Sequence, residues 1–278
     1  MTATSEAFTS FEQKWLAAYP ENALVAVFLP PAQRQRASAF GCLVYELTQT
    51  AFHLRESQVA ASKLAWWRQE LTDAAAGKAR HPIALTLFAD AQVRASDPVL
   101  WPALADAALT HLDQPHASTL ALLLEQFEPY AVVVARVEAA LFGLDGANIE
   151  ANAALWTISH LLRELTNLPR SGERLQLPLS LLARYGVTRA GLAEATADRS
   201  ALARDYLDEL AIEINGALGV ASTRSLTQRV RVRLDRELVA KAKYAADPLT
   251  YLAAHAQAGR MRCLWIAWRE ARAAARDR

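Results

Sequence analysis

Glycine and proline are both scarce in this sequence, with 10 and 11 residues among 278, and this argues against a fold of many short strands and turns. No run of about 18 apolar residues occurs, so no segment is expected to cross a bilayer. The two cysteines, Cys42 and Cys263, lie far apart and lack metal-ligand spacing. Both are therefore expected to be free thiols in a reducing compartment.

An excess of charge of either sign is also lacking, because 30 basic and 29 acidic residues leave a formal net charge of +1. This balance excludes a nucleic-acid binder on grounds of composition. The sequence has no G-x-S-x-G motif and no glycine-rich phosphate loop, so hydrolase and nucleotide-binding functions have no support. No histidine pairs with a second histidine or a cysteine at ligand spacing, and no zinc site is expected. The segment from Met1 to Phe11 lacks a basic start and an apolar core, so no signal peptide is expected and the default location is the cytoplasm.

Alanine and leucine are abundant, and they supply most of a hydrophobic content of 53% that favours helix and suffices for a sizeable core. Apolar residues recur at helical spacing along nearly the whole chain, apart from one extended polar stretch at residues 167–179. No linker, repeat or low-complexity segment divides the chain, so one all-α domain spanning residues 1–278 is predicted. The main helices are predicted at residues 31–53, 57–76, 82–94, 118–142, 148–166, 179–185, 199–218, 222–243 and 248–276.

Several short segments resemble, in order and spacing, those of one protein family. They are Phe28–Arg34, Ala39–Phe40, Ser62–Leu71, His81–Ala84, Leu162–Glu164, Leu175–Pro178 and Arg184–Val187. Together they resemble the squalene/phytoene synthase family along almost the whole chain. The resemblance implies an all-α, single-domain, isoprenoid synthase-like helical bundle with a central cavity.

The family condenses two prenyl diphosphates head to head, and this chemistry needs carboxylates to hold magnesium. Diphosphate is a poor leaving group unless magnesium neutralises it, and magnesium prefers oxygen ligands in octahedral geometry. At the positions of the first aspartate-rich motif this chain has Tyr45, Glu46 and Gln49. At the second motif it has Arg163 and Glu164, and the later acidic pair falls on Asn167 and Leu168, the residues after Thr166. Two lone carboxylates are not expected to fix a three-magnesium cluster.

A similar loss of these motifs occurs in the branch of the family that contains the mitochondrial assembly factors of respiratory complex I. Those proteins carry Glu-Leu-x-Gln where the aspartates belong, and Glu46–Gln49 has the same pattern. The resemblance implies a non-catalytic or altered role, in isoprenoid binding or in assembly work with a protein partner. No cofactor is then expected. The alternative is an active prenyl transferase that uses Glu46, Arg163 and Glu164 with Mg²⁺.

No catalytic residue is assigned, but the degraded motifs provide candidates for ligand binding. They are Tyr45, Glu46, Gln49, His160, Arg163, Glu164 and Asn167. Of these, only Glu46 and Glu164 are candidates for metal binding. Either the two glutamates bind a cation or a polar head group, or they pair with Arg163 or Arg55 on a wetted cavity wall. Tyr45 and Gln49 fit a polar, uncharged cavity or a filled core equally well.

The C-terminal stretch, residues 222–278, is basic, with 13 basic and 5 acidic residues and a net charge of +8. Its last helix mixes Trp265, Ile266 and Trp268 with arginines. This pattern fits a face that binds a membrane surface or a protein partner, and it fits equally a core helix with a solvated outer side. A peripheral position on the inner membrane is the corresponding expectation for a protein that handles an isoprenoid or lipid-like ligand.

Overall fold

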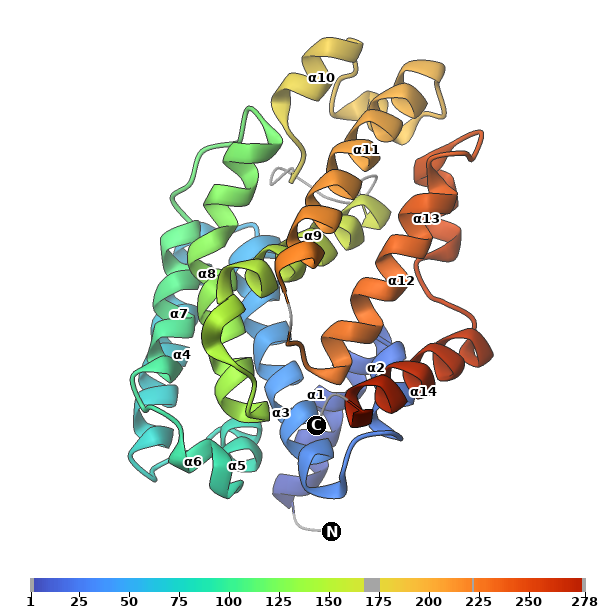
Figure 1. Ribbon diagram of the computed structural model, residues 1–278. Helices are drawn as coiled ribbons and strands as arrows, with labels where there is room; N and C mark the ends of the chain where they lie inside the picture. The colour runs from blue at the N-terminus through green and yellow to red at the C-terminus, as the bar shows by residue number, and fades with distance from the viewer. Residues whose placement is uncertain (1–2, 168–175, 222, 277–278) are drawn as a thin grey trace.

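The computed structural model describes residues 3–167, 176–221 and 223–276, and every regular element in these ranges is helical (Figure 1). The predicted all-α class is therefore confirmed. The α-helices are α1 Ala3–Ala18, α2 Glu21–Ala26, α3 Pro31–Thr48, α4 Ser57–Ala75, α5 Pro82–Phe88, α6 Ala91–Ala95, α7 Leu100–His111, α8 Leu120–Phe142, α9 Ile149–Asn167, α10 Leu179–Tyr185, α11 Ala197–Val220, α12 Leu226–Ala242, α13 Pro248–His255 and α14 Arg260–Arg276. Short turns of other helical types lie at Gln49–His53 (η1), Gly146–Asn148 (η2) and Ala190–Ala193 (η3).

Local signals account for most helix ends. Pro31 occupies the first turn of α3, where a missing N–H is harmless. Gly143 ends α8 with a φ of 63°, a left-handed conformation that glycine adopts without steric cost. The predicted helix over residues 82–94 is wrong in one respect, because Asp90 accepts hydrogen bonds from the Gln92 and Val93 amides and starts α6 as a separate helix.

The predicted helix over residues 248–276 is likewise two helices. α13 ends at His255 and α14 begins at Arg260, directly after Gly259. The break lets α14 turn back across α12 and α2, where Val25, Val230, Cys263, Ile266 and Ala267 form a small apolar core of their own. A larger core draws buried residues from α1 and from α3 through α13.

The helices that carry the two motif positions, α3 and α9, run through the middle of the molecule (Figure 1). α8 packs against α7 and α9, and α11 and α12 also pack against α9. At its C-terminal end α3 widens into the π-helical turn η1, where the Thr50 hydroxyl donates to the Glu46 carbonyl at 2.8 Å. None of the described helices combines the length and hydrophobicity that a membrane span requires.

Candidate functional site

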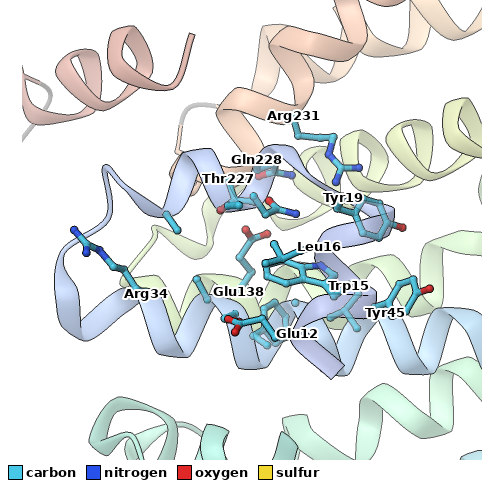
Figure 2. A pocket seen from close by; sticks show the side chains of 18 of the residues that line it. Glu12, Trp15, Leu16, Tyr19, Arg34, Tyr45, Glu138, Thr227, Gln228 and Arg231 are labelled. Atoms are coloured by element: carbon cyan, nitrogen blue, oxygen red, sulfur yellow. The ribbon is translucent and has the colours of Figure 1, made fainter. Parts of the chain in front are cut away.

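A cavity of about 520 Å³ lies between α1, α2, α3, α8, α9 and α12 (Figure 2). Its volume falls in the range of about 300–1,000 Å³ that is typical of small-molecule sites. Much of its wall is aromatic or aliphatic, with Phe8, Trp15, Leu16, Val44 and Trp156 among the residues that line it. The arrangement suits an apolar molecule held by a small number of polar groups.

The first motif contributes only one of its three positions to this cavity. Tyr45 lines the wall and meets Tyr19 edge to face, with ring centroids 6.0 Å apart. Glu46 instead faces α4, where one of its carboxylate oxygens lies 4.0 Å from the Lys63 ammonium. Gln49 begins the η1 turn and does not line the cavity. A polar, uncharged residue therefore stands where the family's first carboxylate would face the cavity.

The second motif places Arg163 in a compact ionic cluster beside the cavity. Its guanidinium lies 2.5 Å from a Glu21 carboxylate oxygen, and Arg231 of α12 approaches the same oxygen at 2.8 Å. Both guanidiniums also stack on the Tyr19 ring, at 4.5 Å and 4.7 Å from its centroid. Burial works to raise the pKa of Glu21, but the charges of Arg231 and Arg163 outweigh it and hold that pKa below its usual value.

Glu164, the other charged residue of this motif, pairs with a histidine from the end of η1. Its carboxylate lies 3.2 Å from His53 Nε2. Burial works to raise the pKa of Glu164, but the hydrogen bond from His53 and the nearby His160 bring it below its ordinary value. The expectation that Glu46 and Glu164 pair with Arg163 or Arg55 is thus wrong, because their partners are Lys63 and His53.

His160 reaches the cavity wall and is held on two sides. Its ring stacks on Trp156 at a centroid distance of 5.5 Å and an interplanar angle of 5°. Its Nε2 lies 2.9 Å from Gln176 Oε1, which can only accept, so Nε2 carries the proton and donates. Burial lowers the pKa of His160 to about 4, and the ring is neutral at physiological pH.

The structure thus brings Tyr45 and His160 to the cavity, while Glu46, Gln49, Arg163 and Glu164 lie outside its lining. Asn167 is the last residue of α9, and its side chain lies outside the described residues, as do Leu168 and the rest of the loop through residue 175. Sequence reasoning missed Glu21 and Arg231. Neither sits in a recognisable motif, and each is significant only because the fold brings it to Arg163.

The residues described at the two motifs do not fit the magnesium cluster that the resemblance implies. Over residues 3–167, 176–221 and 223–276, no three histidine, cysteine or acidic side chains converge so that they could hold a metal ion. The two remaining motif carboxylates each face a basic side chain rather than one another. Magnesium prefers several hard oxygen ligands in near-octahedral geometry, and this donor set does not supply them.

Comparisons with known proteins agree with this architecture. A dehydrosqualene synthase crystallised in complex with ligand is similar in fold, with a TM-score of 0.70 and 16% sequence identity, over 99% of this chain and 98% of that chain. The squalene synthase HpnC from Alicyclobacillus acidocaldarius gives a TM-score of 0.64 and 16% identity, over 91% of this chain and 94% of that chain. These likenesses confirm the predicted isoprenoid synthase-like fold. No match was found among curated proteins. The family model for squalene/phytoene synthase matches residues 17–269, most of the chain, and the chain therefore belongs to the squalene/phytoene synthase family.

Proposed function

We propose that this protein binds an isoprenoid or similar apolar molecule in its central cavity and does not carry out magnesium-dependent condensation of prenyl diphosphates. The observation that carries the proposal is that the charged side chains left at the two motifs lie against acidic or basic side chains of the protein itself. Arg163 pairs with Glu21, Glu164 lies against His53, and a Glu46 carboxylate oxygen lies 4.0 Å from the Lys63 ammonium.

The cluster around Glu21 argues most strongly against diphosphate binding. To hold a phosphate, Arg163 would have to break its ion pair with Glu21, a residue that is only 7% exposed. Breaking a buried ion pair by removing one partner typically costs about 3–5 kcal/mol. Arg231 is bound to the same carboxylate, so neither guanidinium is available without that loss.

The lining of the cavity supports the proposal that an apolar molecule binds there. Aromatic side chains such as Phe8, Trp15 and Trp156 and aliphatic ones such as Leu16 and Val44 offer apolar contact. Each methylene of a ligand that moves from water to such a wall gains about 0.8 kcal/mol. A prenyl chain can therefore bind through burial alone, without a charged anchor.

Titration calorimetry with farnesol and with farnesyl thiodiphosphate, each with and without Mg²⁺, tests the proposal. We expect farnesol to bind and Mg²⁺ to change the affinity of either compound by less than about twofold, because no carboxylate cluster among the described residues couples the metal to the ligand. An affinity for the thiodiphosphate that rises sharply with Mg²⁺ would contradict the proposal. That result would favour an active prenyl transferase that uses Glu46, Arg163 and Glu164.

A second proposal concerns the outer face of α14, which we infer lies on an anionic lipid surface. Cys263, Ile266 and Ala267 point into the small core, whereas Met261, Trp265 and Trp268 are 80%, 43% and 43% exposed. The guanidiniums of Arg262 and Arg269 lie 5.3 Å and 4.7 Å from the Trp265 ring, and that of Arg272 lies 5.0 Å from the Trp268 ring.

Charge and aromatic content together favour a membrane as the occupant of this face. Tryptophan is enriched where membranes meet water, and each arginine near an anionic surface contributes about 1 kcal/mol to binding. Part of the basic C-terminal stretch is used elsewhere, because Arg231 is bound to Glu21 and Arg262 is bound to Glu237 at 2.7 Å. The stacked Arg269 and Arg272 supply the remaining charge beside the exposed tryptophans.

Sedimentation with phosphatidylcholine vesicles, with and without phosphatidylglycerol, tests this face. We expect binding only to the anionic vesicles, and a loss of about tenfold or more in the double variant Trp265→Ser, Trp268→Ser. Trp66→Ser is the matched control, because Trp66 is 46% exposed but lies on α4, and it should leave binding unchanged. No binding of the unaltered protein to either vesicle would refute the proposal and leave the face to a protein partner.

A further inference from the structure

Two buried amide groups on the cavity wall have acceptor oxygens that meet no donor among the described residues. Gln228 is 8% exposed, and its Nε2 donates to the Asn152 carbonyl at 2.9 Å. That bond fixes the orientation of the amide and leaves Gln228 Oε1 without a donor. Asn22 is 6% exposed, and its Oδ1 also lacks a donor. Buried polar atoms are nearly always hydrogen-bonded in native proteins, so both oxygens call for a donor from a ligand.

The two amides come from neighbouring helices and face the same space. Asn22 lies on α2 and Gln228 on α12, and these helices are in contact. Both residues line the cavity. Figure 2 shows Gln228 and Thr227 on one side of the cavity, with the Glu138 carboxyl directed toward them from α8. Both acceptors therefore belong to the polar part of a largely apolar wall.

Two acidic residues, Glu138 and Glu12, also line the cavity wall. The Glu138 carboxylate accepts a hydrogen bond from the Ser225 hydroxyl, and that of Glu12 accepts one from the Ser38 hydroxyl. Burial raises the pKa of Glu138, although the Ser225 hydrogen bond works against that rise. Burial thus favours the neutral form of Glu138, and a carboxylate on the wall repels a diphosphate wherever it is ionised.

The two described arginines that line the cavity do not offset this unfavourable environment for an anion. Arg231 is bound to Glu21 at 2.8 Å. Arg34 is exposed and donates to the Leu29 carbonyl at 2.9 Å and to the Val27 carbonyl at 3.3 Å. In Figure 2 its side chain extends away from the other labelled residues. A diphosphate would thus meet hydrogen-bond acceptors, one arginine paired with Glu21 and one arginine that donates to backbone carbonyls.

We propose that the cavity binds an apolar chain that ends in a hydrogen-bond donor, such as a primary alcohol, more tightly than the diphosphate of the same chain. The hydroxyl donates to Gln228 Oε1, with Asn22 Oδ1 as the second acceptor of the site. The inference rests on the proposed function, since it names the head group of the molecule that the cavity is proposed to bind.

Three probes with one chain separate the contributions of the head group. Farnesol has a hydroxyl donor, farnesyl methyl ether keeps the oxygen but cannot donate, and farnesyl thiodiphosphate is anionic. In titration calorimetry we expect farnesol to bind about tenfold or more tightly than the ether, a gap of about 1.4 kcal/mol, and the thiodiphosphate to bind most weakly. The ether should still bind, because its chain meets the same apolar wall.

Variants assign the preference to the amides. Gln228→Leu should bring farnesol to the affinity of the ether, and Asn22→Leu provides a second, independent variant because it leaves the bond from Gln228 to Asn152 intact. Val44→Ala, on the apolar wall, is the control and should weaken farnesol and the ether equally.

The outcomes separate this inference from the proposed function. If farnesol and the ether bind equally to the unaltered protein, water satisfies the two oxygens and the inference is wrong, while binding of the chain still stands. Tightest binding of the thiodiphosphate overturns the inference as well. If none of the three probes binds, both the proposed function and the inference fail.

Discussion

Replacing Glu21 by glutamine should lower the free energy of unfolding by about 3–5 kcal/mol, the usual cost of removing one partner from a buried ion pair. Glu21 is 7% exposed and its carboxylate neutralises two guanidiniums, those of Arg163 at 2.5 Å and Arg231 at 2.8 Å. Both arginines lie over the same Tyr19 ring, so without Glu21 their two charges would be left with Asp235 as the nearby acidic group. Urea denaturation measures the loss as a lower midpoint at unchanged slope.

Glu237→Gln is the matched control, because Glu237 also binds two arginines but does so at the surface. Its carboxylate lies 3.2 Å from Arg233 and 2.7 Å from Arg262, whose side chains are 39% and 49% exposed. Exposed pairs of this kind contribute about 0–1 kcal/mol each. Similar losses in the two variants would mean that the buried cluster is not essential to the fold.

The same cluster sets a pH dependence with a defined sign. The pKa of folded Glu21 is below its value of 4.5 in the unfolded chain, so ionised Glu21 favours the folded state. Its contribution is fully present above pH 4.5 and is lost as the pH falls through the folded pKa. In Glu21→Gln this part of the acid destabilisation should be missing, whereas Glu237→Gln should keep it.

The helical architecture was predictable because its signals are local. Apolar spacing gave the helices, and Pro31 and Gly143 marked ends that the structure confirms. The two breaks that were missed are also local in origin. Asp90 caps a new helix inside an apolar pattern that continues across it, and Gly259 precedes α14 after only a short gap. A periodicity that persists across a short gap cannot reveal the change in direction.

The site was less predictable because pairing between distant helices leaves no trace in spacing. Of the candidates at and beside the motifs, Tyr45 and His160 lie on the cavity wall, and their role in ligand binding stays a prediction. Glu21, however, reads in the sequence as an acidic residue in the first turn of a short helix, and Arg231 as one basic residue among many. Only the fold brings Glu21 of α2 and Arg231 of α12 together with Arg163 of α9.

Changing Gly41 to alanine should lower the affinity for farnesol by about a hundredfold, or about 2.8 kcal/mol. A Cβ at Gly41 would lie 2.3 Å from Trp15 Cζ2 and 2.6 Å from Trp15 Cε2, distances that no packed structure tolerates. Trp15 lines the cavity, so its indole must move, and the adjacent open space is the cavity itself. The displaced ring would occupy the volume that the chain of the ligand needs.

Gly216→Ala is the matched control, because Gly216 also lies within a helix, α11, but a Cβ there would meet nothing within 4 Å. It should raise the free energy of unfolding by about 0.5–1 kcal/mol through helix propensity and leave farnesol binding unchanged. Gly41→Ala gains the same helix propensity but has an overpacking cost of about 1–3 kcal/mol. Its free energy of unfolding should therefore fall modestly, while its affinity for farnesol falls steeply. Calorimetry and urea denaturation on the two variants measure both quantities. If Gly41→Ala behaves like Gly216→Ala in both, Trp15 moves away from the cavity, and the tight contact between α1 and α3 does not determine the shape of the binding site.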